Sequence, residues 1–170
     1  NQVLKEIGRT MEAFMAVYGL EEGLPFYRLQ ASVGDSAEVG EIQAGHFYLA
    51  FDVSGQQLIA FVDPVVVFGQ DTSLFRPAGF AAEPLGKLRQ RRQITSGRTP
   101  CGLFGTSANL KSGEAITLYA LIGHVSSAEA IQRERARLTQ AAYVQQKRQE
   151  ARQLVEDLTD AVASQTSLPQ

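Results

Sequence analysis

The chain has 170 residues, the length of one domain or of one domain with an appendage, and its hydrophobic fraction of 44% is ordinary for a globular protein. The formal net charge is −2, and the acidic first half and basic second half differ too mildly to predict nucleic-acid binding. The single cysteine, Cys101, excludes a disulfide framework and a multi-cysteine metal site, and no apolar run approaches the roughly 20 residues that a membrane span needs.

The first residue and the cysteine content of the chain indicate whether it is part of a longer protein and in which compartment it is found. The sequence starts with Asn1 rather than Met and shows no signal-peptide pattern, so we expect a piece of a longer protein. A lone cysteine agrees with a reducing compartment, and we therefore expect a cytoplasmic location. Neither a nucleic acid nor a membrane is expected as a partner.

The N-terminal part gives an ambiguous pattern. Residues 3–18 place apolar side chains at helical spacing, and Gly19 stands where a helix would end. Gly8 and Thr10 weaken that helix, so an extended structure stays open as the alternative. After it, residues rich in Gly, Glu and Ser predict loops around one short strand, Phe26–Leu29.

The central part predicts a β-hairpin. The segments His46–Val53 and Gln57–Val62 are apolar and aromatic, as strands are, and the turn pair Ser54-Gly55 separates them. Because proline cannot donate to a central ladder, Pro64 should end the second strand or place a bulge in it.

The region after Pro64 is expected to be extended or loop-like. The β-branched run Val65–Phe68 predicts a further strand, residues 69–79 a loop, and the polar, basic residues 83–100 a connection. Leu103-Phe104 predicts a short strand, and Ala115–Ile122 the last strand. Both faces of that last strand are apolar, which favours the interior of a sandwich.

A helical arm should follow the last strand directly. Ser126 or Ser127 is expected to cap it, and Ser126 with Glu129 fits a capping box. The chain then runs to about residue 163 without Pro or Gly, and residues 145–153 are polar all round, which predicts a solvent-bridging helix or a helix split in two. Packing on another domain of the same protein explains this arm better than a coiled coil, whose heptads it lacks.

The candidate chemical groups each have a simpler structural explanation. His46 and His124 lack neighbouring metal-type ligands, and Cys101 lacks an evident histidine partner, so structural roles are expected for all three. The glycine-rich run at 96–109 lacks the lysine and the following helix of a phosphate loop.

Two groups of charged residues also have simpler explanations. Asp52, Asp63 and Asp71 bracket the central strands, and a pair of carboxylates can hydrolyse a glycoside, but turn formation is the favoured explanation. The basic run KLRQRR at 87–92 could attract phosphate groups, but a solvated connection is favoured.

Three stretches carry a resemblance to a known family. They read FVDPVVVFGQDTSLFRPAGF at 61–80, TSGRTPCGLFGTSANLKSGEAITLYALIGHVSSAEAI at 95–131, and LTDAVASQTSLPQ at 158–170. Over about residues 45–170 the chain resembles the N-terminal region of cellobiose-phosphorylase-type glycoside phosphorylases. The most similar branch holds the β-1,2-oligoglucan phosphorylases and the cyclic β-1,2-glucan synthases.

The resemblance implies a fold and a domain order. It implies a mainly β fold with added helices, in which an antiparallel β-sandwich of the supersandwich type precedes long linker helices. Residues 1–125 would be the sandwich region, which need not be complete at its N-terminal side. Residues 126–170 would be the helical linker to a catalytic (α/α)₆ barrel that lies outside these residues.

The resemblance also implies a non-catalytic role. Family members cleave a β-glucosidic bond with inorganic phosphate and inversion, or transfer glucan, which makes them glycosyltransferases. Their general acid and phosphate site are in the barrel, so no catalytic residue, metal or cofactor is expected here, and phosphate is only a co-substrate of the parent enzyme. Expected partners are the barrel, a β-glucan oligosaccharide bound by the parent enzyme and, as in some relatives, a second copy in a homodimer. The loop residues expected to border the substrate cleft are Gln70, Asp71, Thr72 and Arg98.

Two other functions stay open. The chain could be a stand-alone carbohydrate- or protein-binding β-sandwich, although it has no Trp to stack on sugars and would rely on Tyr27, Tyr48 or Phe75. It could also be a helix-mediated assembly module built on residues 126–165.

Overall fold

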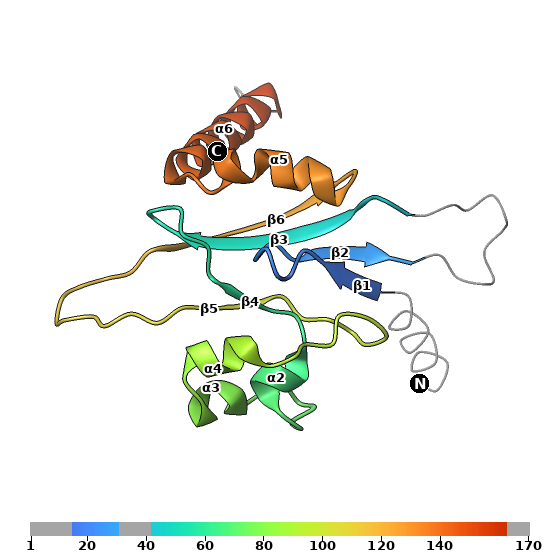
Figure 1. The fold of residues 1–170 in the computed structure, drawn as a ribbon. Coiled ribbons are helices and arrows are strands. Elements are labelled where there is room, and N and C mark those ends of the chain that lie inside the picture. The colour runs from blue at the N-terminus through green and yellow to red at the C-terminus, as the bar shows by residue number, and fades with distance from the viewer. Residues whose placement is uncertain (1–14, 31–41, 163–170) are drawn as a thin grey trace, which may run out of the picture.

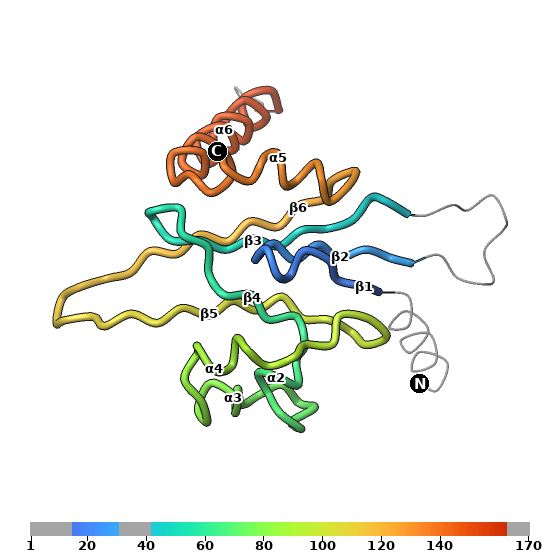
Figure 2. Tube along the Cα trace, viewed as in Figure 1, coloured from blue at the N-terminus to red at the C-terminus, as the bar shows by residue number. Residues whose placement is uncertain are grey.

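The computed structural model describes residues 15–30 and 42–162, and these form a mixed α and β fold with two antiparallel sheets and five helices (Figure 1, Figure 2). The larger sheet has the strand order β1-β2-β3-β6, and the smaller sheet pairs β4 with β5. The strands are β1 (Met15–Tyr18), β2 (Phe26–Leu29), β3 (Gly45–Asp52), β4 (Ile59–Phe61), β5 (Leu103–Gly105) and β6 (Leu118–Val125). The helices are α2 (Pro64–Phe68), α3 (Ala78–Ala82), α4 (Leu85–Gln90), α5 (Ala128–Leu138) and α6 (Ala141–Val162).

The elements lie in layers on the two sides of the larger sheet. Helices α5 and α6 lie on one side, while β4, β5 and the short helices α2 to α4 lie on the other (Figure 1). The second layer is thus a two-stranded sheet with short helices. A β-sandwich is therefore not shown by the described residues, in which helices also hold more residues than strands do.

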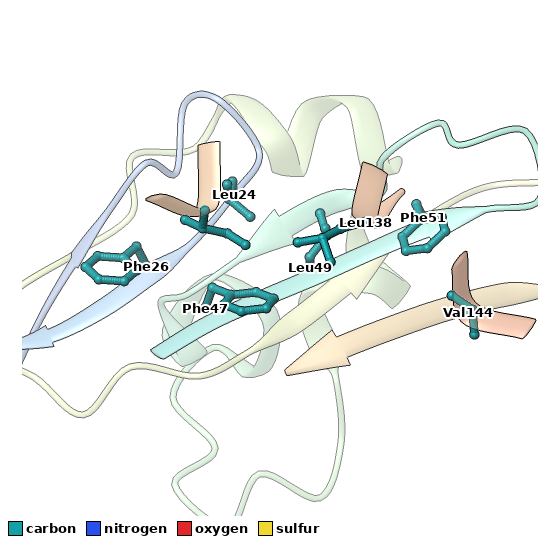
Figure 3. Close-up of a cluster of buried hydrophobic side chains, with 8 residues drawn as sticks. Leu24, Phe26, Phe47, Leu49, Phe51, Leu138 and Val144 are labelled. Carbon is teal, nitrogen blue, oxygen red and sulfur yellow. The ribbon is translucent and has the colours of Figure 1, made fainter. Parts of the chain in front are cut away.

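The main core lies between the larger sheet and the two C-terminal helices. Strand β3 alternates so that Phe47, Leu49 and Phe51 face this core, where Leu49 and Phe51 are completely buried (Figure 3). The other buried members of the cluster are Leu24, Phe26, Ile131, Leu138 and Val144. This contact between the β3 face and the two helices is what fixes the helical arm to the sheet.

A second, smaller core holds the short helices against β4. Its buried members are Phe61, Val66, Val67 and Leu88, which come from β4, α2 and α4. A turn joins β3, which belongs to the first core, to β4, which belongs to the second. The hairpin predicted there is confirmed at its turn, since the Asp52 N–H donates to the Gln56 carbonyl (3.0 Å), but β4 then leaves β3 and pairs with β5 instead.

The prediction of a strand at Val65–Phe68 is wrong, because these residues form α2. Asp63 is the N-cap of this helix, and its carboxylate accepts the Val65 N–H at 3.0 Å. Pro64 occupies the first turn, where its missing N–H is not needed. The cap and the burial of two valines outweigh the β preference of the run.

The last strand is present but lies three residues later than predicted, at β6. Its side chains alternate as expected, but only one face is covered, so the expectation of two buried faces is wrong. On the open face Leu118 is 43% exposed and Ile122 is 74% exposed. The alternation is correct because it depends on strand geometry alone, whereas coverage depends on what packs there.

The helical arm is split, as one of the two sequence interpretations proposed. Ser127 is the N-cap of α5 and accepts the Ala130 N–H, so Ser127 and not Ser126 has this role. The break falls at Thr139 and Gln140, before the polar stretch that suggested it. In the described ranges no helix combines the length and the apolar character required to cross a membrane.

Some of the other predicted elements are confirmed and others differ from the structure. The short strands at Phe26–Leu29 and Leu103-Phe104 are confirmed as β2 and as part of β5. The expected connection at 83–100 contains α4. Of the ambiguous segment 3–18, the described end Met15–Tyr18 is a strand, and its other residues lie outside the described part.

Candidate functional site

Asp52 and Asp71 form turns, as the sequence interpretation favoured. The Asp52 carboxylate accepts from the Ser54 hydroxyl (2.6 Å), the Ser54 N–H and the Gln56 N–H. The Asp71 carboxylate accepts from the Ser73 hydroxyl (2.5 Å), the Ser73 N–H and the Arg76 N–H. In each case the serine hydroxyl is the main reason that the pKa of the carboxyl lies below its usual value.

Asp63 is a buried structural carboxylate. It is only 3% exposed, and besides capping α2 it accepts the Ile94 N–H (3.0 Å) and pairs with the Arg98 guanidinium (3.3 Å). Its oxygens therefore join α2 to the segment that runs toward β5. With every bond directed into the fold, this carboxylate is not positioned to reach a substrate.

The four residues expected to border a substrate cleft are placed at two ends of α2. Gln70, Asp71 and Thr72 follow the C-terminal end of the helix, and Gln70 and Thr72 are exposed. Arg98 lies at the other end, where it pairs with Asp63. The expected cleft border therefore divides into an exposed loop and a separate ion pair.

The aromatic residues considered for sugar stacking are mostly packed. The Tyr27 hydroxyl donates to the Cys101 carbonyl (2.8 Å), and burial raises the pKa of Tyr27. The Tyr48 ring packs edge-on against Phe104 at 4.8 Å between centroids. Phe75, at 90% exposed, is the one of the three named residues with a free ring face.

Cys101 lies between the two sheets. Its N–H donates to the Val62 carbonyl (2.8 Å), and its thiol contacts the Phe61 carbonyl at 3.5 Å. Burial, with a smaller contribution from the Asp63 carboxylate, raises the pKa of Cys101 to about 11. A thiol in this environment is held in its unreactive protonated form at neutral pH.

We therefore expect Cys101 to resist alkylation by iodoacetamide at about pH 8 in the folded chain and to react rapidly when the chain is unfolded in guanidinium chloride. The unfolded thiol, with a pKa of 9.0, loses its proton before the folded thiol at about 11. The free energy of unfolding should accordingly fall as the pH rises from about 9 to about 11, and Cys101→Ser should lack this component. Equal labelling rates for the folded and unfolded chain at about pH 8 would contradict this assignment.

The two histidines face each other across β3 and β6. His46 and His124 are directly opposite in the register, with ring centroids 4.9 Å apart in an edge arrangement, and both are exposed. Over the described ranges, no group of three or more His, Cys, Asp or Glu side chains is placed to hold a metal ion. The pair remains a cross-strand contact of two rings.

The described residues form a polar groove of about 970 Å³. Its floor is formed by Val17 and by residues 57–60, and the turn 19–23 forms one wall. The opposite wall is the segment 89–95, and Arg135 of α5 lies at the groove as well. Four arginines and two glutamates line it: Arg89, Arg91, Arg92, Arg135, Glu21 and Glu22.

Hydrogen bonds fix the arginine-bearing wall in place. The Gln93 side chain accepts from the Val62 N–H (2.7 Å) and donates to the Ala60 carbonyl (3.2 Å), which holds it along β4. The Val17 N–H donates to the Thr95 carbonyl (2.7 Å), which ties the same segment to β1. The run KLRQRR, interpreted from sequence as a solvated connection, thus carries three arginines of the groove. Its charge was the only sequence signal of this site.

Comparison of the chain with known proteins gave no match, whether with protein-family models, with curated proteins or with solved structures.

Proposed function

We propose that the chain is the non-catalytic β-sandwich and linker portion of a glycoside phosphorylase or glucan-processing transferase that acts on β-glucans. In this role the sheet and the arm support the catalytic (α/α)₆ barrel of the parent enzyme and border its cleft. The observation that carries the proposal is the row of exposed apolar side chains on α6. Such a row is expected to pack against another protein domain.

This row lies in the C-terminal half of α6. Val144, near the start of the helix, is buried in the main core. The later residues Leu154, Leu158 and Val162 recur at a spacing of four and are 59%, 58% and 80% exposed, with Val155 beside them at 62%. A continuous apolar stripe on a helix is normally buried against a neighbour.

The charges of α6 also point to a neighbour. Helix α5 has Glu129 in its first turn and Arg135 and Arg137 in its last turn, which is the arrangement that the helix dipole favours. Helix α6 has no acidic residue in its first turn and no basic residue in its last, and Asp160 lies near its C-terminal end. Because no charged residue complements the helix dipole at either end of α6, packing against a partner surface is a further source of stability for its C-terminal end.

The open face of β6 supports the sandwich part of the proposal. β6 is at the edge of the larger sheet, and its face away from α5 carries Leu118 and Ile122, which are 43% and 74% exposed. Further strands of a larger sandwich would pack at such a face and edge.

The chemistry is best placed outside the described residues. Asp52, Asp63 and Asp71 are occupied by turn and cap hydrogen bonds, and the Cys101 thiol is protonated at neutral pH. A scaffold role needs no reactive side chain, whereas an independent enzyme would.

The test begins with an antibody raised against the chain, which is used to purify the native polypeptide that contains this sequence. The native polypeptide and the chain alone are then each assayed with β-1,2-linked glucan oligosaccharides and inorganic phosphate. We expect a longer polypeptide that releases α-glucose 1-phosphate or transfers glucan, and no turnover by the 170-residue chain. Calorimetry of the chain with the same oligosaccharides should give no heat of binding. Turnover by the chain itself, tight glycan binding by it, or a native polypeptide inert on β-glucans would overturn the proposal.

A further inference from the structure

The groove between the turn 19–23 and the segment 89–95 contains polar groups that the fold does not use. Arg91 is partly neutralised by Glu83, which lies 2.5 Å away. Arg89 and Arg92, by contrast, have no hydrogen-bond or ion-pair partner in the part of the chain that the structure describes. Two guanidinium groups therefore face solvent at a groove whose arginine-bearing wall is fixed by hydrogen bonds.

Gln57 provides a second, independent sign of a ligand. Its side-chain oxygen accepts from the Arg135 guanidinium, and a Cβ added at Gly23 would lie 3.2 Å from that oxygen, so the amide is held between the turn and α5. Its Nε2 is buried and has no acceptor within the described residues. A buried N–H donor without a partner calls for an acceptor supplied from elsewhere.

The charge and size of the groove define the chemistry of that acceptor. Four arginines against two glutamates leave an excess of positive charge, which favours an anion. Guanidinium groups bind phosphate through paired hydrogen bonds, and Glu21 and Glu22 on the other wall can accept from hydroxyl groups. The volume of about 970 Å³ lies at the upper end of what small-ligand sites provide.

We propose that this groove binds a small phosphorylated, hydroxyl-rich molecule of the sugar phosphate class. Arg89 and Arg92 hold the phosphate, Gln57 donates to the ligand through Nε2, and the glutamates accept from its hydroxyl groups. The proposal depends on the groove alone and does not require the architectural function proposed above.

Binding is tested by isothermal titration calorimetry on the full chain with glucose 6-phosphate, inorganic phosphate, gluconate and glucose. We expect glucose 6-phosphate to bind most tightly, inorganic phosphate more weakly, and glucose and gluconate at least about tenfold more weakly than glucose 6-phosphate. Equal binding of gluconate would overturn the assignment of a phosphate site, and absence of phosphate and sugar phosphate binding at millimolar concentration would overturn the site itself.

A matched pair of double variants separates a built site from general charge attraction. Arg89→Gln with Arg92→Gln removes the two unpaired guanidinium groups at the groove. Arg148→Gln with Arg152→Gln removes the same charge from exposed positions of α6. We expect the first pair to weaken glucose 6-phosphate binding by roughly tenfold or more and the second by less than about twofold, since solvent screens distant surface charges. Equal loss in both double variants would show non-specific attraction only.

The substitution Gln57→Glu tests the buried amide. It keeps an oxygen for Arg135, removes the Nε2 donor and adds a negative charge at the groove. We expect it to weaken glucose 6-phosphate binding by about tenfold while the thermal unfolding midpoint stays close to that of the parent chain. Unchanged affinity would place the ligand away from Gln57 and contradict the proposed site.

Discussion

Replacing Phe51 with alanine is expected to lower the free energy of unfolding by about 3–5 kcal/mol, the usual cost of truncating a fully buried phenylalanine. Phe51 is completely buried on β3, and its ring lies 5.4 Å from that of Tyr119 on β6. It also belongs to the cluster in which Leu138 and Val144 attach the two helices to the sheet. The loss should therefore destabilise the sheet and the helical arm together.

The measurement is urea denaturation followed by circular dichroism at helical and aromatic wavelengths. Phe75→Ala is the matched control, because the same side chain at 90% exposure should cost no more than about 0.5 kcal/mol. If Phe51→Ala does not fold, Phe51→Leu should give a smaller, measurable loss on the order of 1 kcal/mol. A cost for Phe51→Ala similar to that of Phe75→Ala would contradict the arrangement of the main core.

The second large effect is expected at Asp63. Asp63→Ala should cost about 3 kcal/mol, since it removes the cap of α2 and leaves the Ile94 N–H and the Arg98 guanidinium without their buried acceptor. Asp71→Ala is the comparison, because Asp71 also accepts three hydrogen bonds but lies in an exposed loop where water can replace them. Its cost should be clearly smaller than that of Asp63→Ala, because water replaces the lost hydrogen bonds.

Chemical denaturation of the two aspartate variants under the same conditions measures this difference. A third variant, Asp63→Asn, keeps the shape of the side chain and an acceptor oxygen for the cap, so it should fall between the parent chain and Asp63→Ala. Equal costs for the alanine substitutions at positions 63 and 71 would show that the burial of Asp63 has no energetic consequence, which contradicts its role as a structural carboxylate.

The elements that depend on local rules could be predicted from the sequence. The strand at Phe26–Leu29, the turn at Ser54-Gly55 and the start of α5 each follow from a few adjacent residues, and the structure has all three. Helix α2 could not be predicted, because its valines prefer strands. Its formation depends on Asp63 and on a core that includes the distant Leu88.

Features that depend on contacts between distant segments could not be predicted from the sequence. Nothing next to Ile122 indicates that one face of β6 is open, since that depends on which elements pack across the sheet. The groove brings together a turn at 19–23, the end of the hairpin, a basic segment at 89–95 and Arg135 of α5. The sequence showed the basic charge of one wall but not the opposite wall or the buried amide of Gln57.

Hydrogen exchange of α6 tests the central claim most directly, namely that another part of the parent protein covers the arm. Backbone amides of residues 148–162 are compared in the 170-residue chain and in the native parent polypeptide, with β3 as the internal reference. We expect exchange slower by about tenfold or more on this segment in the parent, with little change in β3. Equal exchange of α6 in both proteins would show that its apolar row is uncovered in the parent, which contradicts the proposed supporting role.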